Sequence, residues 1–225
     1  MISAVSDNPP PAIEPRLSAA SLACRRGHRV LFQNLDLVVA PGQIVWLRGQ
    51  NGRGKTSLLK LAAGLSAPEH GQVLCEGRPV RRSLAAQQRL LYIGHANALK
   101  EDLTACEALD FLLRIHGRPH GPDVACAALE RLGMHSRRHA MVRTLSQGQR
   151  RRIALARLAV EDSPSLWLLD EPYDALDADG VARVDALLAG NAERGGSVML
   201  TSHLSLDTAR LRPIEIDLDR YAATA

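Results

Sequence analysis

The eight residues from Gly49 to Thr56 constrain the fold of this chain more than any other stretch. They read GQNGRGKT and fit the pattern G-x-x-x-x-G-K-[ST]. The apolar run QIVWLR precedes them, and an apolar segment over 55–63, closed by Gly64, follows, so the loop should join a strand to a helix. A chance glycine-rich turn would need the whole pattern and both flanks by accident. The stretch therefore predicts a phosphate-binding loop in an α/β fold.

Each part of this loop has a physical task at a phosphate chain. The glycines allow backbone N–H groups to surround phosphate oxygens, and the helix N-terminus adds positive potential. Lys55 can reach the β- and γ-phosphates, and the Thr56 hydroxyl can be a ligand of Mg²⁺. The predicted phosphate-binding residues are consecutive: Gly49, Gln50, Asn51, Gly52, Arg53, Gly54, Lys55, Thr56 and Ser57.

Strand-like and helix-like segments alternate around this loop, which favours a mostly parallel sheet with helices on both faces. The expected strands are 17–24, 29–32, 35–40, 43–48, 71–77, 90–93, 165–169, 197–201 and 213–218. A helix is expected over 179–192. The middle of the chain, about 96–160, reads as helical: Thr104 and Glu107 form a capping-box pattern, and Ser146 precedes another helix. We predict an inserted helical subdomain there and an antiparallel β region at the N-terminus.

Composition bounds the remaining possibilities. Residues 1–16 are proline-rich and predict a disordered tail, leaving 17–225 as one domain. The four cysteines lack metal-ligand spacing and read as small buried hydrophobes. Aromatic residues make up 3% of the chain, which disfavours base-stacking platforms for nucleic acid. No apolar stretch approaches the length of about 18 residues that a membrane helix needs, so we expect a soluble protein or one held at a membrane by a partner.

A second motif begins at the apolar strand ending in Leu169, after which Asp170 and Glu171 appear. Ligands of open α/β sheets bind outside the carboxyl ends of the strands. Asp170 is thus a candidate Mg²⁺ ligand, and Glu171 can polarise an attacking water. Adjacent carboxylates alone would suit any exposed strand end, but the phosphate loop upstream makes the metal and base roles the better interpretation.

A third motif, LSQGQ, spans Leu145 to Gln149 and opens a helix. Ser146 as N-cap and Gly148 leave free N–H groups at a helix start, which is an anion site. A second phosphate-reading helix is redundant within one chain but useful across a two-fold interface. We interpret the arginines that follow, Arg150 to Arg152, as a solvated helix face.

Two histidines follow buried strands. His203 ends VMLTSH and could contact a γ-phosphate or orient the water beside Glu171. His95 ends LLYIGH, and a lone histidine in that position is more often a packing or loop residue.

Together these motifs resemble the ATP-binding cassette ATPases over nearly all of the chain after residue 16. The family's order is matched by Walker A at 49–56, the signature at 145–149, Walker B at 166–170, the catalytic glutamate at Glu171, the D-loop at 175–177 and the switch histidine at His203. The resemblance implies ATP and Mg²⁺ as ligands. It also implies a head-to-tail homodimer in which Ser146, Gly148 and Gln149, with Asp177, complete the partner's ATP site.

The sequence departs from the family at two points. The family stacks adenine on an aromatic residue upstream of Walker A, whereas the matching stretch here, CRRGH, has none; Arg26 could stack its guanidinium instead. The family also places a glutamine, which touches the Mg²⁺ site, at the position of His95. That alignment favours a catalytic role for His95 over a role in packing or in a loop.

Within the superfamily, YIGH at 92–95, Lys100 and DEPYDALD at 170–177 look like the ATP-binding subunit of bacterial heme exporters of cytochrome c maturation. The resemblance implies a peripheral subunit on the cytoplasmic face of the inner membrane. Its partners would be integral permease subunits of the B and C types and, indirectly, heme and a periplasmic heme chaperone. Another small-solute transporter, or a soluble cassette acting on nucleic acid or ribosomes, stays open as an alternative.

Overall fold

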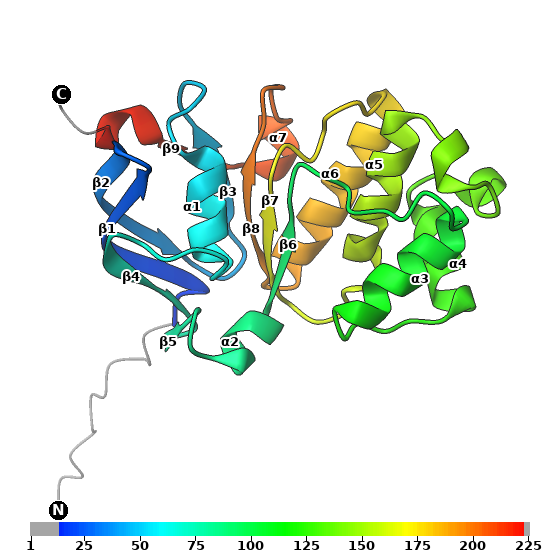
Figure 1. Ribbon diagram of the computed structural model, residues 1–225, viewed down its shortest axis with the longest axis horizontal. Helices are drawn as coiled ribbons and strands as arrows, with labels where there is room; N and C mark the ends of the chain where they lie inside the picture. The colour runs from blue at the N-terminus through cyan, green and yellow to red at the C-terminus, as the bar shows by residue number, and fades with distance from the viewer. Residues whose placement is uncertain (1–13, 223–225) are drawn as a thin grey trace, which may run out of the picture.

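The computed structural model describes residues 14–222 and has two sheets with helices between and beside them. In Figure 1 the antiparallel sheet lies at one end, followed by helix α1, the parallel sheet, helix α6 and a group of helices at the far end. One hydrophobic core surrounds α1 between the sheets, and another joins the parallel sheet to the helical group. The predicted fold class is confirmed.

The antiparallel sheet has the strand order β2-β1-β4-β5. Its members are β1 (Leu17–Arg26), β2 (Arg29–Val39), β4 (His70–Cys75) and β5 (Arg78–Pro79). The sequence predicted two strands where the structure has the single strand β2. Asn34, at φ 53°, and a register shift between the pairs Leu22–Leu35 and Cys24–Phe32 explain the difference, because β2 carries the extra residue there. Such a bulge breaks the alternation of side chains without ending the strand.

The second sheet is parallel throughout, in the order β6-β7-β8-β3-β9. Its strands are β6 (Leu90–Ile93), β7 (Leu166–Leu169), β8 (Ser197–Thr201), β3 (Ile44–Arg48) and β9 (Ile214–Asp217). The central strands are apolar runs because helices cover both faces of the sheet. All the carboxyl ends lie at one edge, which gathers residues from distant parts of the sequence.

Two longer helices cover this sheet. Helix α1 (Lys55–Ala62) packs between the two sheets, and α6 (Ala178–Glu193) lies on the opposite face of the parallel sheet (Figure 1). The short helix α7 (Thr208–Leu211) follows β8. The helices expected over 55–63 and 179–192 are confirmed to within a residue or two, whereas α7 was not predicted.

The helical group contains α3 (Ala105–Ile115), α4 (Pro122–Arg131) and α5 (Gln147–Leu155). The 3₁₀ turns η1 (His135–Arg137), η2 (Val142–Thr144) and η3 (Ala156–Val160) join or extend them. The predicted capping box at α3 is present: the Thr104 hydroxyl accepts from the Glu107 N–H at 3.3 Å, and the Glu107 carboxylate accepts from the Thr104 N–H at 2.8 Å. This group lies within the predicted subdomain.

Some elements were not foreseen. Helix α2 (Leu84–Gln88) precedes β6, and the 3₁₀ turn η4 (Leu218–Tyr221) follows β9. Residues 1–13 of the predicted tail lie outside the described residues, whereas Arg16 donates to the Gly195 carbonyl at 3.0 Å. Cys24, Cys75 and Cys106 are buried free thiols, as expected, whereas Cys126, also a free thiol, is only half-buried. Among residues 14–222, no helix is both long and apolar enough to cross a membrane.

The interpretation of the arginine run as a solvated face was wrong. Arg151 and Arg152 are 3% and 8% exposed, and Arg150 is half-buried. The physical reason is that their guanidinium groups satisfy carboxylates and backbone carbonyls that would otherwise lack donors. Charge alone in a sequence does not reveal such acceptors.

Candidate functional site

The phosphate loop runs from the end of β3 to the start of α1. Gly54 is the N-cap of α1 with φ 99°, and a Cβ there would lie 3.1 Å from that of Leu31. Only glycine suits both the left-handed backbone and this close approach. Lys55 Nζ donates to the Gly49 carbonyl at 2.6 Å, so its ammonium group lies folded back over the loop.

Asp170 lies at the carboxyl end of β7 and is 3% exposed. Its Oδ1 accepts from the Thr56 hydroxyl at 3.1 Å and from the Thr201 hydroxyl at 3.0 Å. The three side chains bring hard oxygen donors from α1, β7 and β8 to one point. This donor set fits Mg²⁺, which prefers carboxylate and hydroxyl oxygens.

Glu171 is the next residue, and its backbone is left-handed at φ 49°. Its N–H donates to the Thr201 hydroxyl at 2.9 Å, and its carboxylate accepts from the His203 N–H at 2.9 Å. His203 Nε2 lies 3.6 Å from the same carboxylate. The Glu171 side chain is 12% exposed, so it is held in place but open to the cleft.

These groups line one cleft of about 480 Å³ above the phosphate loop. Of the residues singled out from the sequence, the cleft brings together Arg26, Asn51, Gly52, Gly54, Lys55, Thr56, Ser57, His95, Asp170, Glu171 and His203. Arg29, Leu31 and Asp174 also line it and were missed. Arg29 follows Arg26 across the hairpin between β1 and β2, no motif included Leu31, and Asp174 lies in the stretch DEPYDALD but was not predicted to be a site residue.

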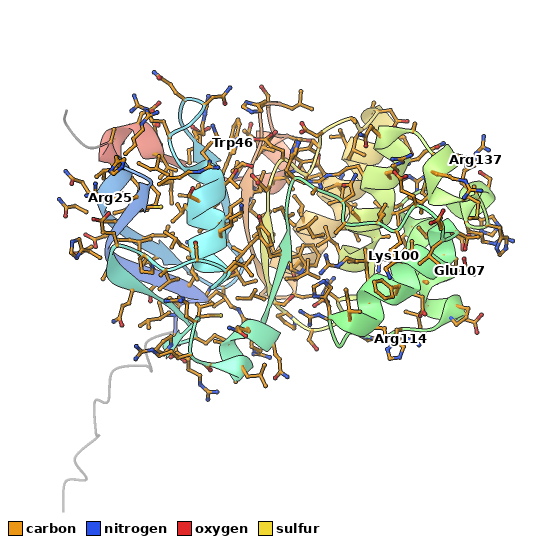
Figure 2. The ribbon with its side chains drawn as sticks, viewed as in Figure 1. Arg25, Trp46, Lys100, Glu107, Arg114 and Arg137 are labelled. Carbon is orange, nitrogen blue, oxygen red and sulfur yellow. The ribbon has the colours of Figure 1, made fainter. Side chains whose placement is uncertain are left out.

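His95 lies at the mouth of this cleft with a side chain that is 73% exposed. Its Nδ1 is 3.4 Å from the carboxylate of Asp174, four residues after Asp170. Behind it, Tyr92 packs against Gly94, and burial followed by the nearby Asp170 charge raises the pKa of Tyr92 to about 12. Lys100 lies away from the cleft, with its ammonium 4.4 Å from the centre of the Phe111 ring on α3 (Figure 2).

The signature segment lies elsewhere in the chain. Ser146 caps α5 by accepting from the Gln149 N–H at 3.2 Å, and the Gln149 side chain accepts from the Ser146 N–H at 3.0 Å. A Cβ on Gly148 would lie 2.3 Å from the Ala175 carbonyl, so glycine is required there. Among residues 14–222, the lining of the phosphate cleft does not include these residues.

Asp177 ends the D-loop as the N-cap of α6. It accepts from the Gly180 N–H at 2.8 Å and pairs with Arg152. The backbone hydrogen bond and then the Arg152 guanidinium lower the pKa of Asp177. Its side chain is 72% exposed and lies outside the phosphate cleft. Through Arg152, the D-loop is tied to the helix that the signature opens.

A neighbouring cleft lies on the other side of the phosphate loop, beside η4. Asp219 accepts from the Gln50 N–H at 3.0 Å and pairs with Arg53 Nε at 2.8 Å. Two residues predicted to bind phosphate are thus engaged with a carboxylate from the end of the chain. The sequence did not predict this contact. The segment 213–218 was predicted as a strand, and no motif included Asp219, the residue after it.

Trp46 also lines this second cleft (Figure 2). Its indole Nε1 donates to the Ser202 carbonyl at 3.4 Å, and the Arg48 guanidinium lies 4.6 Å from the centre of its ring. The indole therefore connects the strand before the phosphate loop with the segment that carries His203.

The chain is similar to known proteins along most of its length. A family model described as "ABC transporter" matches residues 32–174. The "Cytochrome c biogenesis ATP-binding export protein CcmA" of Pseudomonas fluorescens is 47% identical over 210 residues, covering 92% of this chain and 98% of the relative. The protein of the same name from Aromatoleum aromaticum is 44% identical over 210 residues, with coverage of 93% and 98%.

Solved structures agree on the fold. An ABC transporter ATP-binding protein from Pyrococcus furiosus superposes with a TM-score of 0.78 at 21% identity, covering 92% of this chain and 99% of that one. A dimeric ATP-binding cassette in a post-hydrolysis state with ADP and Pi has a TM-score of 0.75 at 22% identity, with coverage of 90% and 94%.

Proposed function

Because this chain belongs to the ABC transporter family and, within it, to the cytochrome c biogenesis ATP-binding export proteins, we propose that it powers heme export for the assembly of c-type cytochromes. It is an ATP hydrolase of the ABC type. The observation that carries the proposal is the cleft itself: Glu171 and His203 meet the phosphate loop at one sheet edge, in a chain matching these relatives along almost its whole length.

The residues of the cleft would divide the work of hydrolysis. Lys55 and the N–H groups of the loop and α1 bind the phosphates and favour charge that develops on them. Thr56 and Asp170 would hold Mg²⁺, which when bound neutralises charge on the phosphate oxygens. Glu171 accepts a proton from the attacking water, and His203 keeps that carboxylate and the water aligned.

The signature and D-loop residues would complete the site of a second copy. Ser146, Gly148, Gln149 and Asp177 lie outside the phosphate cleft of their own chain, which supports a head-to-tail dimer. In that arrangement the N-terminus of α5 faces the γ-phosphate bound by the partner. His95, at the mouth of the cleft, would act beside Glu171 as the family's glutamine does.

The dimer would sit on the cytoplasmic face of the bacterial inner membrane, bound to integral permease subunits of the B and C types. Heme and a periplasmic chaperone would be reached through those subunits. Closure with ATP and opening after hydrolysis would supply the movement.

The test is complementation of a bacterial strain that lacks its cytochrome c biogenesis ATPase. We expect the chain to restore c-type cytochromes and to co-purify from membranes with the permease subunits. Glu171→Gln should co-purify as well but restore nothing, which ties the rescue to hydrolysis. An active, well-expressed chain that restores no c-type cytochrome would refute heme export. Salt-dependent co-purification with nucleic acid or ribosomes, in place of permeases, would favour the alternative class.

A further inference from the structure

Arg151 forms a buried link between the signature helix and the turn that carries Glu171. It lies on α5, with 3% of the residue exposed. Its Nη2 donates to two successive carbonyls, those of Asp170 at 2.7 Å and Glu171 at 2.9 Å. Its Nε donates to the Pro172 carbonyl at 3.4 Å. Three carbonyls in a row after β7 therefore converge on one guanidinium.

The same side chain also holds the loop that carries His95. Its Nη1 donates to the Gly94 carbonyl at 2.9 Å and to the Asn97 side-chain oxygen at 3.2 Å. These acceptors lie on either side of His95 in the sequence. One residue of α5 thus contacts two neighbouring loops that line the nucleotide cleft, the loop after β6 and the loop after β7.

We propose that Arg151 is a positioning residue that sets the path of the Glu171 backbone and transmits movement of the signature helix to it. The proposal rests on the proposed dimer, since only there does the start of α5 meet a nucleotide. Arg151 is five residues after Ser146, about 7.5 Å along the helix axis. A displacement of the helix start therefore reaches the Glu171 turn through a rigid element and short hydrogen bonds.

The Glu171 backbone explains why such an anchor is needed. At φ 49° it adopts a left-handed conformation, which only glycine adopts without strain. Contacts with neighbouring groups must therefore stabilise this conformation. The Thr201 hydroxyl fixes the N–H of Glu171 and Arg151 fixes its carbonyl. With both ends of the residue held, the carboxylate points into the cleft.

Arginine is suited to this task by its shape and its charge. A guanidinium offers five N–H donors in one plane, whereas lysine offers a single rotating ammonium. Burial lowers the pKa of Arg151, and the carboxylates of Asp174, Asp170 and Glu171 oppose this effect. The group stays protonated at neutral pH, so all of its donors remain available.

The consequence is communication between the two ATP sites of the dimer. The signature end of α5 would sense the nucleotide on the partner, while Arg151 holds the catalytic glutamate of its own chain. Binding at one site would then align hydrolysis at the other, and ATP turnover should be cooperative. Loss of Arg151 should reduce turnover and cooperativity more than ATP binding.

The test compares Arg151→Lys and Arg151→Gln with Arg118→Lys in the full-length protein. Arg118 is a matched control because its guanidinium also bonds a backbone carbonyl, that of Leu90 in β6 at 2.9 Å, and pairs with a carboxylate, that of Glu161 at 3.2 Å. These contacts lie at the start of β6, away from the nucleotide. Measurements are ATP affinity by calorimetry, kcat, the Hill coefficient and thermal stability.

We expect both Arg151 variants to lower kcat by about tenfold or more and to bring the Hill coefficient toward about 1, with ATP affinity changed by less than about threefold. Arg118→Lys should lower thermal stability while leaving the Hill coefficient unchanged. Arg151→Lys, which retains a buried cation, keeps the test valid if Arg151→Gln does not fold.

Equal losses of stability in Arg151→Lys and Arg118→Lys, with kcat and cooperativity near wild type in both, would overturn the proposal. The test is independent of heme export, because it uses purified protein. A chain that fails to restore cytochromes but shows the Arg151 effect would refute only the proposed function. Restored cytochromes without the Arg151 effect would refute only this inference.

Discussion

Glu171 is held by its backbone as much as by its side chain. Three neighbours hydrogen-bond to this residue. The Thr201 hydroxyl accepts from its N–H, the His203 N–H donates to its carboxylate, and the Arg151 guanidinium donates to its carbonyl. A carboxylate that acts as a base must stay within a narrow range of positions relative to its water, and this arrangement would supply that restriction without filling the cleft.

Glu171→Gln should bind ATP normally and lower kcat by about 10²- to 10⁴-fold, because the amide cannot accept the proton of the attacking water. The amide oxygen can still accept from the His203 N–H, so the local structure should persist. ATP should then hold the variant as a dimer, measurable by gel filtration with and without nucleotide. Near-normal hydrolysis by this variant would remove Glu171 from the role of base.

His95 allows a graded test. His95→Gln should reduce kcat by less than about threefold, because an amide can still interact with a polar partner across the cleft, whereas His95→Ala should cost about tenfold. Steady-state ATP hydrolysis measures both. Equal effects of the two substitutions would return His95 to a role in loop packing.

The chemistry-bearing residues were far easier to predict than those that position them. Lys55, Asp170 and Glu171 stand in motifs whose spacing is set by contact with a nucleotide. Arg151 bonds mainly backbone carbonyls, and every residue type carries a carbonyl, so its acceptors leave no trace in the sequence. Its neighbours Arg150 and Arg152 made the run look like a solvated helix face.

Among the elements, the short turn η4 contacts the phosphate loop at several positions. Leu218 and Asp219 pack within 3.5 Å of the position that a Cβ on Gly49 would take. The Asp219 carboxylate also binds the Gln50 N–H and the Arg53 side chain. The end of the described chain therefore supports the outer half of the phosphate loop, while the glycines of the inner half remain free to face phosphate.

Asp219→Ala should destabilise the protein by about 1–3 kcal/mol and weaken ATP binding, because it removes a charged acceptor from a backbone N–H of the loop. Thermal unfolding and ATP titration measure the two effects. Glu215→Gln is the matched control, since the exposed Glu215–Arg48 pair at 3.0 Å contributes about 0–1 kcal/mol. Indistinguishable results for the two variants would show that η4 does not support the loop.

Elements were predictable where local pattern and burial coincide. The strand β7 is a run of apolar residues closed by carboxylates, and α3 begins at a capping box. The single strand β2 was predicted as two because a bulge at Asn34 hides its continuity. Helix α2 and the turn η4 are too short for periodicity to detect, since they contain at most about one helical turn.

In the whole molecule, the two halves of the predicted ATP site lie on different parts of the chain. The phosphate loop, Asp170 and Glu171 share one cleft, whereas Ser146 and Gly148 lie on the helical group. If Ser146 and Gly148 complete the ATP site of a second copy, as proposed, a two-fold pair of chains would have two equivalent composite sites.

Mixing Lys55→Ala protein with Ser146→Arg protein should therefore restore hydrolysis that neither shows alone. Random pairing makes about half of the dimers mixed, each with one intact site, so at most about a quarter of wild-type activity is expected, and less if the two sites cooperate. An ATPase assay across mixing ratios measures this. No recovery at any ratio, together with normal activity of each variant alone, would exclude the composite site.

The placement of the tryptophans has a practical consequence for optical measurement. The chain has two, and Trp167 is fully buried in β7, with its indole bonded to the Ser165 hydroxyl at 2.9 Å. Trp46 touches the segment that carries His203 and stacks with Arg48. In a Trp167→Phe protein, the fluorescence of Trp46 should change in intensity when ATP binds and recover after hydrolysis. If the emission of Trp46 does not change when ATP binds, the segment that carries His203 does not move on binding. A responsive signal would make each turnover visible in stopped-flow experiments without any added dye.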